Sequence, residues 1–460
     1  MTSPLSQLAD PSLLKTGALI NGQWHAGNSQ FVVTDPATGA HLADVANMGP
    51  TDAEAAIAAA NAAWAGWRNT TAKQRANIMR KWYDLLMANQ ADLARIMTAE
   101  QGKPYAEAMG EVAYGASFVE WFAEEAKRVN GETLPTFDNN RRLLVLREPI
   151  GVCAAITPWN FPLAMITRKV APALAAGCPV IIKPAELTPL TALAAAELAM
   201  RAGIPAGVLN MLSSDASQSI AIGKVLCASD VVRHISFTGS TEVGRILMAQ
   251  SAPTVKKLSL ELGGKNPNIV FADADLDQAV ETAVRAGFTN QGEICLCGSR
   301  ILIQQPIYNT FREKFLAKVQ ALTVGDPREQ VNLGALVSEG HLHKVLGYVQ
   351  LARDEGGTVL CGGNRLHPDG PCRDGFFMEP TVIEGLGNTC RTNQEEIFGP
   401  VVTLQPFEDE GEALALANGT PFGLAAQVWT SDLSRAHRVA QQLKFGLVWV
   451  NCWMIRDLRT

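Results

Sequence analysis

Apolar residues recur with helical spacing through residues 52–128, a stretch rich in Ala, Glu, Lys, Trp and Met. This pattern, clear in AKQRANIMRKWYDLL at 72–86, predicts several amphipathic helices. It breaks at residues 129–150, where RRLLVLRE at 141–148 predicts an extended, partly exposed strand that could belong to a protruding hairpin.

From residue 151 onward, short apolar runs alternate with Ala- and Leu-rich helical stretches. We expect strands at 179–183, 207–212 and 232–237, and helices at 191–202 and 241–251. A second series begins near residue 268, with a helix at 276–287 and a strand at 299–304, and continues to 448–451. Such alternation predicts parallel sheets with helices on both faces. No internal repeat or low-complexity linker is present, so short crossings should join closely packed domains.

Composition narrows the class of protein. A chain of 460 residues is too long for one ordinary core, and 47% hydrophobic with 18% charged residues is typical of a well-packed enzyme. The net charge of −6 and the lack of a Lys/Arg run argue against nucleic acid as a partner. No apolar stretch is long enough for a membrane span and no signal peptide is evident, so we expect a cytoplasmic protein.

The nine cysteines are odd in number and scattered, which indicates a reduced protein without a disulfide framework. The Cys295–Cys297 pair has no second pair, and no HExxH pattern occurs, so we expect no metal. For any one cysteine the ordinary interpretation is an inert buried thiol, which we apply to Cys153, Cys178 and Cys227.

Two segments carry chemistry: FTNQGEICLCGS at 288–299 and LELGGKNP at 260–267. The first contains Cys295, which can attack a carbonyl, and the second contains Glu261, a carboxylate that can activate water to release the product. The leucines flanking Glu261 predict apolar surroundings. The simpler alternative is a strand-terminal carboxylate that caps a turn.

Together these segments resemble the two active-site signatures of the NAD(P)-dependent aldehyde dehydrogenase superfamily, and further matches run from about residue 20 to 451. The resemblance implies an α/β fold with two αβ domains that have open, parallel-type sheets. Residues 1–128 and 151–261 would form a Rossmann-like NAD-binding domain, 129–150 an oligomerisation hairpin, and 262–460 the catalytic domain.

The resemblance also implies the catalytic residues. Cys295 would be the nucleophile, with Cys297 accessory or structural, and Glu261 the general base. In TPWNFP at 157–162, Asn160 would stabilise the oxyanion together with the Cys295 N–H. Out of context, an asparagine before Phe-Pro is more often a turn residue. Glu261 favours release of a free acid over transfer to coenzyme A.

For the cofactor there is no GxGxxG, but FTGSTEVG at 237–244 is a strand, a glycine turn and a helix start, which can hold pyrophosphate. KPAE at 183–186 should end the first strand of the cofactor sheet and contact the adenosine ribose, although Glu186 could instead cap a helix. An acid there favours NAD over NADP. In EEIFGP at 395–400, Glu396 and Phe398 would contact the nicotinamide ribose and ring. The full expected cofactor set is Thr157, Pro158, Trp159, Lys183, Glu186, Gly239, Ser240, Gly244, Glu396 and Phe398.

Two arginines bear on the substrate. Arg168 lies eight residues after Asn160, and Arg456 lies in a segment that lines the substrate tunnel in the family, where we also expect Phe161 and Trp453 to contribute. A guanidinium fork suits a carboxylate, so we expect a semialdehyde; the alternative is that both arginines form surface or inter-domain salt bridges.

The type of semialdehyde is less sharply marked. Residues 116–128 resemble succinate-semialdehyde dehydrogenases, whereas 290–297 and 447–459 resemble the 2-aminomuconate and 2-hydroxymuconate semialdehyde enzymes. Thr289 stands where the succinate enzymes carry an arginine, which favours the muconic type slightly.

The family normally continues beyond Thr460 with a final strand that pairs across subunits, so we expect a homodimer or homotetramer if that strand is dispensable. Two alternatives stay open: a broad dehydrogenase for neutral aldehydes, and an inactive truncated dehydrogenase with a structural role.

Overall fold

The chain forms two compact units. The computed structural model describes residues 4–455, 457 and 458. The first unit comprises Met1–Thr34, His41–Glu100 and Ala108–Glu261, and the second comprises Asp35–Ala40, Gln101–Glu107 and Leu262–Thr460. The main division therefore falls directly after Glu261. Two short N-terminal segments, Asp35–Ala40 and Gln101–Glu107, belong to the second unit.

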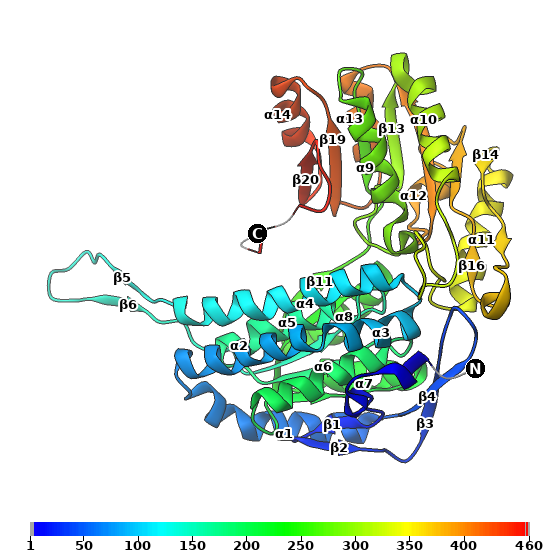
Figure 1. The fold of residues 1–460 in the computed structure, drawn as a ribbon. Helices are drawn as coiled ribbons and strands as arrows, with labels where there is room; N and C mark the ends of the chain where they lie inside the picture. The colour runs from blue at the N-terminus through cyan, green and yellow to red at the C-terminus, as the bar shows by residue number, and fades with distance from the viewer. Residues whose placement is uncertain (1–3, 456, 459–460) are drawn as a thin grey trace. The chain divides into compact units, whose positions relative to one another are not determined.

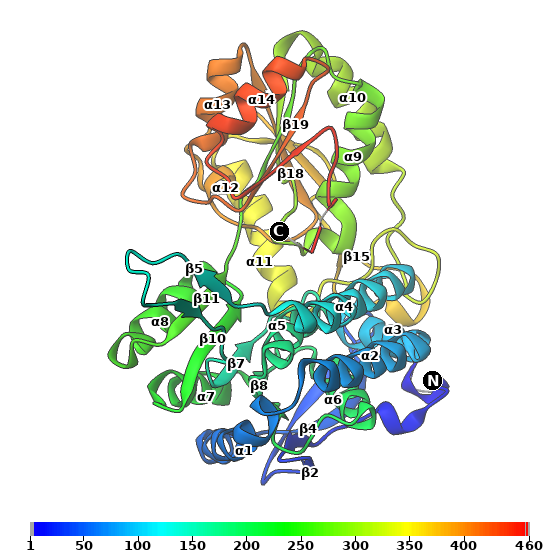
Figure 2. The same ribbon diagram turned by 90° about the vertical axis from the view of Figure 1, so that its left-hand side faces the viewer.

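Four helices precede the parallel strands of the first sheet, as the apolar spacing predicts: α1 (Pro50–Arg68), α2 (Ala72–Ala88), α3 (Gln90–Gln101) and α4 (Tyr105–Glu125). A capping box between Thr71 and Gln74 starts α2. Buried tryptophans join α1 and α2 to the helices α5 (Ala164–Ala176) and α6 (Pro189–Ala202): Trp67 Nε1 donates to the Leu174 carbonyl at 3.2 Å, and Trp82 Nε1 to the Ala195 carbonyl at 3.1 Å. Figure 2 shows α2 lying beside α6.

The sheet of the first unit has the order β11-β10-β7-β8-β9-β1-β2. Its parallel strands are β7 (Val152–Ile156), β8 (Val180–Lys183), β9 (Leu209–Met211), β10 (Val232–Thr238) and β11 (Lys257–Glu261). The helices that follow the first four of these strands are α5 (Ala164–Ala176), α6 (Pro189–Ala202), α7 (Ala216–Ala228) and α8 (Thr241–Ser251). The predicted parallel α/β arrangement is confirmed for this part of the sheet.

Two features of this sheet differ from the prediction. β1 (Ala18–Ile20) and β2 (Gln23–His25) add an antiparallel edge, so the sheet is mixed. Lys183 ends the second strand of the alternating series, not the first, because β7 precedes it. The VCAAI run of β7 has two alanines, which have low strand propensity, and it forms a strand because it is covered on both faces.

The expected hairpin is present within 129–150. It is formed by β5 (Glu132–Leu134) and β6 (Leu143–Val145), which pair antiparallel and project from the body of the first unit (Figure 1). Its large apolar side chains are exposed, with Phe137 94%, Leu146 75% and Leu144 67% exposed. An isolated two-stranded hairpin has little stability of its own in water.

The second unit has its own sheet, of order β14-β17-β18-β13-β12-β19-β20. All pairings are parallel except that of β14 with β17. Its strands are β12 (Pro267–Val270), β13 (Arg300–Gln304), β14 (Thr358–Cys361), β17 (Thr381–Glu384), β18 (Val401–Phe407), β19 (Ala425–Trp429) and β20 (Leu447–Val450). One core contains Phe288, Phe311 and Phe315, and another contains Phe271, Phe407 and Val439. The helices are α9 (Leu276–Phe288), α10 (Tyr308–Gln320), α11 (Glu339–Asp354), α12 (Arg391–Gln394), α13 (Glu410–Asn418) and α14 (Leu433–Gln442).

Short pairs complete the fold: β3 (Gln30–Thr34) with β4 (His41–Ala46), and β15 (Arg365–Leu366) with β16 (Phe377–Met378). Among the helices of the described residues, none has the length and apolar character needed to cross a membrane.

Candidate active site

The carboxyl ends of four neighbouring strands gather the predicted residues of the first unit. β7 and β8 end with Ile156 opposite Lys183, and β10 and β11 end with Thr238 opposite Glu261. β8 and β9 lie on one side of β7, whereas β10 and β11 lie on the other. Open α/β sheets bind ligands at such a switch point, outside the carboxyl ends of the strands.

The segment after β7 is held at both ends. Thr157 N–H donates to the Lys183 carbonyl at 3.1 Å, and Thr188 Oγ1 donates to the Trp159 carbonyl at 3.4 Å. Pro158 and Phe161 are half-buried, and Asn160 is 5% exposed.

Glu111 of α4 holds the turn that follows Asn160. This buried carboxylate accepts the N–H groups of Leu163 and Ala164 at 2.9 and 3.2 Å, at the start of α5. It therefore fixes where the Asn160 turn meets α5. No local pattern singles out Glu111, since its partners lie 52 and 53 residues further along the chain.

The expected ribose contacts form an ion pair, with Lys183 Nζ 3.6 Å from Glu186 Oε2. Lys183 is buried, which lowers its pKa, while the Glu186 charge acts in the opposite direction. The simpler interpretation, that Glu186 caps the next helix, does not hold. The first N–H groups of α6, from Leu190 and Thr191, are instead bound by the buried Glu100 at 2.6 and 2.8 Å.

The glycine turn after β10 leads into α8. Gly239 N–H donates to the Glu261 carbonyl at 3.1 Å, and Ser240 Oγ caps the helix by accepting the Val243 N–H at 3.2 Å. Gly244 is buried in the first turn. The positive end of an eleven-residue helix therefore lies at the switch point.

Glu261 does not have the apolar surroundings that its flanking leucines predict. Its side chain is exposed, because β11 is the edge strand of the sheet and alternates exposed with half-buried positions. A solvent-exposed carboxylate at a strand end can reach water directly.

The Cys295 loop of the second unit follows α9 and has unusual backbone geometry. Asn290, Gln291 and Gly292 have φ values of 52°, 56° and 72°. A Cβ on Gly292 would lie 2.2 Å from the Gly399 carbonyl oxygen, so only glycine fits. Cys295 is half-buried, whereas Cys297 is buried and burial raises its pKa. Of the two thiols, Cys295 is the one suited to reaction.

Asn266 fastens the loop to the sheet. Its Nδ2 donates to the carbonyls of Cys295 and Cys297 at 2.7 and 2.9 Å, and its Oδ1 accepts the Ala425 N–H at 3.1 Å. Trp453, predicted to contact substrate, donates from Nε1 to the Leu296 carbonyl at 3.2 Å and so lies against the same loop. Arg456 lies outside the described residues.

Glu396 lies against the glycine pair that precedes Lys265. Its Oε1 accepts the Gly264 N–H at 3.0 Å, and a Cβ on Gly263 would lie 2.3 Å from Oε2. Burial raises the pKa of Glu396, and the charges of Lys344 and Lys265 act against this. Burial, reinforced by Arg300, lowers the pKa of Lys265 to about 7. The sequence pattern alone assigns no role to Lys265.

Arg168, on α5, is half-buried. Its guanidinium carbon lies 5.6 Å from the centroid of the Phe118 ring. Among the described residues it makes no ion pair, so the salt-bridge interpretation of this arginine finds no partner there.

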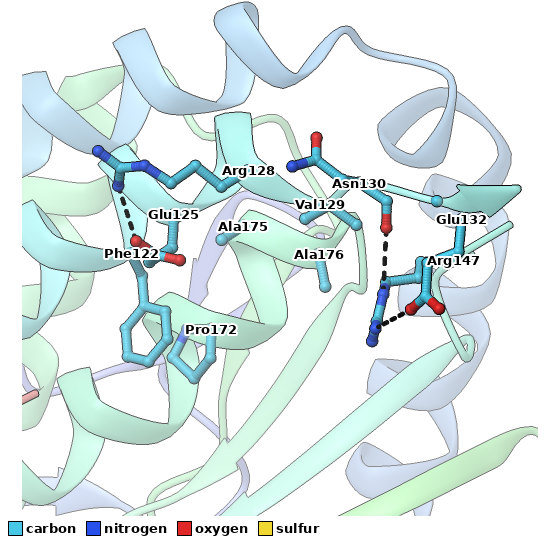
Figure 3. Close-up of a pocket in the computed structure, with 11 residues that line it drawn as sticks. Phe122, Glu125, Arg128, Val129, Asn130, Glu132, Arg147, Pro172, Ala175 and Ala176 are labelled. Atoms are coloured by element: carbon cyan, nitrogen blue, oxygen red, sulfur yellow. Dashed lines mark hydrogen bonds and ion pairs between the residues drawn. The ribbon is translucent and has the colours of Figure 1, made fainter. Parts of the chain in front are cut away.

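A cavity of about 490 Å³ opens at the base of the hairpin (Figure 3). Two of its arginines are paired: Arg128 with Glu125 at 2.7 Å, and Arg147 with the Asn130 carbonyl at 3.1 Å. None of the predicted site residues lines it. The described part of the chain also contains no group of three or more His, Cys, Asp or Glu side chains that could hold a metal ion.

The first unit therefore has a sheet with a switch point, where open α/β sheets bind ligands, and the second unit has a half-buried thiol on a loop fixed by side-chain hydrogen bonds. These are features of an α/β enzyme with a candidate cysteine nucleophile. The chain belongs to the aldehyde dehydrogenase family, whose sequence profile matches residues 24–460. It is an NAD(P)-dependent aldehyde dehydrogenase, and the resemblance inferred from the two signatures is confirmed.

Relatives cover nearly the whole chain. The Escherichia coli (strain K12) succinate-semialdehyde dehydrogenase [NADP(+)] GabD is 49% identical over 98% of this chain and 92% of its own length. The 3-sulfolactaldehyde dehydrogenase of Pseudomonas putida is 50% identical over 97% and 90%. The crystal structure of succinate-semialdehyde dehydrogenase from Burkholderia pseudomallei is similar with a TM-score of 0.95 and 52% identity, covering 98% and 92%.

Proposed function

We propose that this enzyme oxidises an aldehyde that carries an acid group at its far end, a semialdehyde, to the corresponding diacid. The observation that carries the proposal is Arg168, a half-buried guanidinium without an ion-pair partner among the described residues. Two of the relatives are named for succinate semialdehyde and 3-sulfolactaldehyde, both of which are anionic aldehydes. A guanidinium can bind either acid group through two parallel hydrogen bonds.

In the proposed mechanism the Cys295 thiolate attacks the aldehyde carbon. The Asn160 amide and the Cys295 N–H donate to the oxyanion as it forms, which favours the transition state over the substrate. Bound NAD would supply the hydride acceptor, and loss of a hydride from the former aldehyde carbon would leave that carbon bonded to Cys295 as a thioester. Glu261 then takes a proton from water, and the water cleaves the thioester to release the acid and the thiol.

The residues around the switch point fit a dinucleotide. The start of α8 would hold the pyrophosphate, and Lys183 with Glu186 would bind the adenosine ribose. A carboxylate at 186 would repel a 2′-phosphate, so we propose NAD as the preferred cofactor. Because GabD is named as an NADP enzyme, both cofactors need to be assayed. Glu186→Ser should lower the ratio of kcat/KM for NAD to that for NADP by roughly tenfold; an unchanged ratio would remove this argument.

The relatives change the order of candidate substrates. The sequence pattern alone slightly favours a muconic semialdehyde, whereas relatives of about 50% identity are named for shorter anionic aldehydes. We therefore place succinate semialdehyde first, with the one-methylene-longer glutarate semialdehyde, and 2-hydroxymuconate semialdehyde after them.

The test is the rate of NADH formation with these three semialdehydes, and with butanal as the neutral control. Arg168→Gln should lower kcat/KM for the acids by roughly 10- to 100-fold, the value of a charge-assisted pair, and change butanal by less than about threefold. Arg285→Gln, on an exposed position of α9, is the matched control. Cys295→Ala should abolish NADH formation with every substrate.

Two outcomes would refute the proposal. Preference of the wild type for butanal would favour the broad neutral-aldehyde alternative and leave Arg168 without a substrate role. Folded wild type that makes no NADH with any aldehyde would favour the inactive, structural alternative.

We further propose a homo-oligomer that covers the hairpin, since Phe137, Leu144 and Leu146 would otherwise stay in water. Sedimentation of the wild type against Phe137→Ser and Leu144→Ser tests this, and a monomeric wild type would refute it. We keep the cytoplasm as the proposed location.

A further inference from the structure

A fully buried carboxylate, Glu293, lies two residues before Cys295. Its exposed fraction is 0%. Its Oε1 accepts the Val337 N–H at 3.1 Å, and its Oε2 accepts Gln101 Nε2 at 2.9 Å. Burial raises its pKa well above the usual range, while these donors and the nearby Lys103 charge act against the rise. A buried charged or polar group is costly unless such partners satisfy it, so its placement constrains the loop.

The Gln101–Glu107 segment provides the other half of this contact. It is anchored in the second unit, since the Ala335 N–H donates to the Gly102 carbonyl at 3.1 Å. The segment is also hydrogen-bonded to the start of the Cys295 loop, where Glu107 Oε2 accepts the Asn290 N–H at 2.9 Å. The Gln101 amide is itself oriented, because its Oε1 accepts the Lys103 N–H at 3.0 Å and its Nε2 is thereby directed at Glu293.

A histidine, His341, lies close to both Glu293 and the Phe398 segment. His341 Nε2 lies 3.7 Å from Glu293 Oε1 and 2.7 Å from the Phe398 carbonyl oxygen. Burial lowers the pKa of His341 to about 4, so the ring is neutral near pH 7. A carbonyl only accepts, so we assign the hydrogen to Nε2. The His341 and Phe398 rings also meet edge to face, 6.2 Å between centroids.

We propose that Glu293 is a positioning residue that holds the Cys295 loop in its reactive place against the segments of Gln101 and Val337, by accepting hydrogen bonds from both residues. This rests on the proposed role of Cys295 as the nucleophile. The rate of a reaction falls steeply when the attacking atom is displaced by a fraction of an ångström from its productive position, so fixing the loop should raise the rate at which Cys295 reacts.

A reciprocal exchange tests the pairing. In Glu293→Gln the amide oxygen can still accept from Val337, but its NH₂ group faces the NH₂ group of Gln101. In Gln101→Glu two carboxylates face each other. The double variant, Gln101→Glu with Glu293→Gln, again pairs one donor with one acceptor. The amide introduced at position 293 donates, and the carboxylate introduced at position 101 accepts from this amide and from the Lys103 N–H. A double-mutant cycle then isolates the interaction from the separate costs of each change.

Two readouts separate positioning from simple stability. The first is kcat with saturating NAD and aldehyde. The second is the rate at which iodoacetamide alkylates Cys295, located by fragment ions in the tryptic peptide 286–300, which also holds Cys297. We expect Glu293→Gln to lower both roughly tenfold, Gln101→Glu to lower them further, and the exchange to recover them to within about threefold. Glu281→Gln, at an exposed position of α9, should change neither kcat nor the alkylation rate.

The proposal fails if folded Glu293→Gln keeps wild-type kcat and alkylation, or if the exchange is no better than Glu293→Gln alone. An exchange variant that does not fold would also overturn it, since the complementary pair would then not be interchangeable. Because alkylation needs no aldehyde, a wild type that reacts with iodoacetamide but makes no NADH would refute the proposed function while leaving the positioning role testable.

Discussion

Asn266 offers a quantitative test of how the nucleophile loop is held. Its side chain is 2% exposed and makes three hydrogen bonds, to the carbonyls of Cys295 and Cys297 and from the Ala425 N–H. Each bond has a net value of about 0.5–1.5 kcal/mol. Asn266→Ala should therefore lower the free energy of unfolding by about 2–4 kcal/mol. For a domain of about 150–250 residues this is a fall in Tm of roughly 4–16 °C.

The nearly isosteric Asn266→Asp variant sharpens the test. The carboxylate keeps an acceptor for Ala425, but it places an oxygen where the donor stood, 2.7 and 2.9 Å from two carbonyl oxygens. Removing a donor while keeping the volume leaves two buried acceptors facing a third. We expect Asn266→Asp to be at least as destabilising as Asn266→Ala, and kcat to fall in both because the Cys295 carbonyl is released.

Thermal melting and NADH formation measure the two effects side by side. Asn364→Ala is the control, because this exposed asparagine makes a comparable 2.9 Å bond to Glu379 at the surface and should change stability by less than about 0.5 kcal/mol. If Asn266→Asp melts within about 2 °C of the wild type and turns over normally, the hydrogen bonds do not hold the loop and the reasoning is wrong.

Two further predictions concern the same region. Gly292→Ala should unfold at a much lower temperature or fail to fold, because φ at this position is 72° and the added Cβ would lie 2.2 Å from the Gly399 carbonyl oxygen. The control is Gly347→Ala: this glycine lies on α11 with open space around it, so the variant should melt at or above the wild-type temperature. Lys265 has a folded pKa of about 7 against an ordinary 10.5, so between those values the unfolded chain binds a proton that the native state does not, and stability should rise with pH. Urea unfolding at about pH 7 and about pH 9.5 should show this rise in the free energy of unfolding of the wild type, and a smaller rise in Lys265→Met. An equal rise in both proteins would contradict a lowered pKa for the buried Lys265.

Secondary structure was predictable where periodicity and end signals coincide. The helix at 241–251 has the predicted limits, since Ser240 is a side-chain cap directly after a glycine turn. β7 went unassigned because two alanines weaken its strand signal, and the strands β1 and β2 are too short to show a period. Burial on both faces and pairing with distant strands, which determine these elements, are not local properties.

The catalytic candidates were accessible to sequence reasoning because their chemistry is local: a thiol in a glycine turn and a carboxylate before a glycine pair. Their supports were not. Glu111, Gln101 and Glu293 are unremarkable polar residues in sequence, and the Gln101–Glu293 contact joins positions 192 residues apart. The exposure of Glu261 was missed for a related reason, because only the strand order places β11 at an edge.

These supports share one physical design. Each candidate loop is irregular, so a helix or sheet ladder cannot satisfy all its backbone groups. A buried or half-buried side chain from a distant element binds them instead: Glu111 after Asn160, and Asn266 and Glu107 around Cys295. Such a side chain has fixed bond lengths and a single well-satisfied rotamer, so it defines a loop's position more sharply than apolar packing does. A loop fixed in this way can hold a nucleophile still without itself becoming regular structure. On this argument the change from glutamate to glutamine at 293 should alter reactivity more than it alters the melting temperature, whereas the loss of Asn266, which binds two carbonyls at once, should alter both.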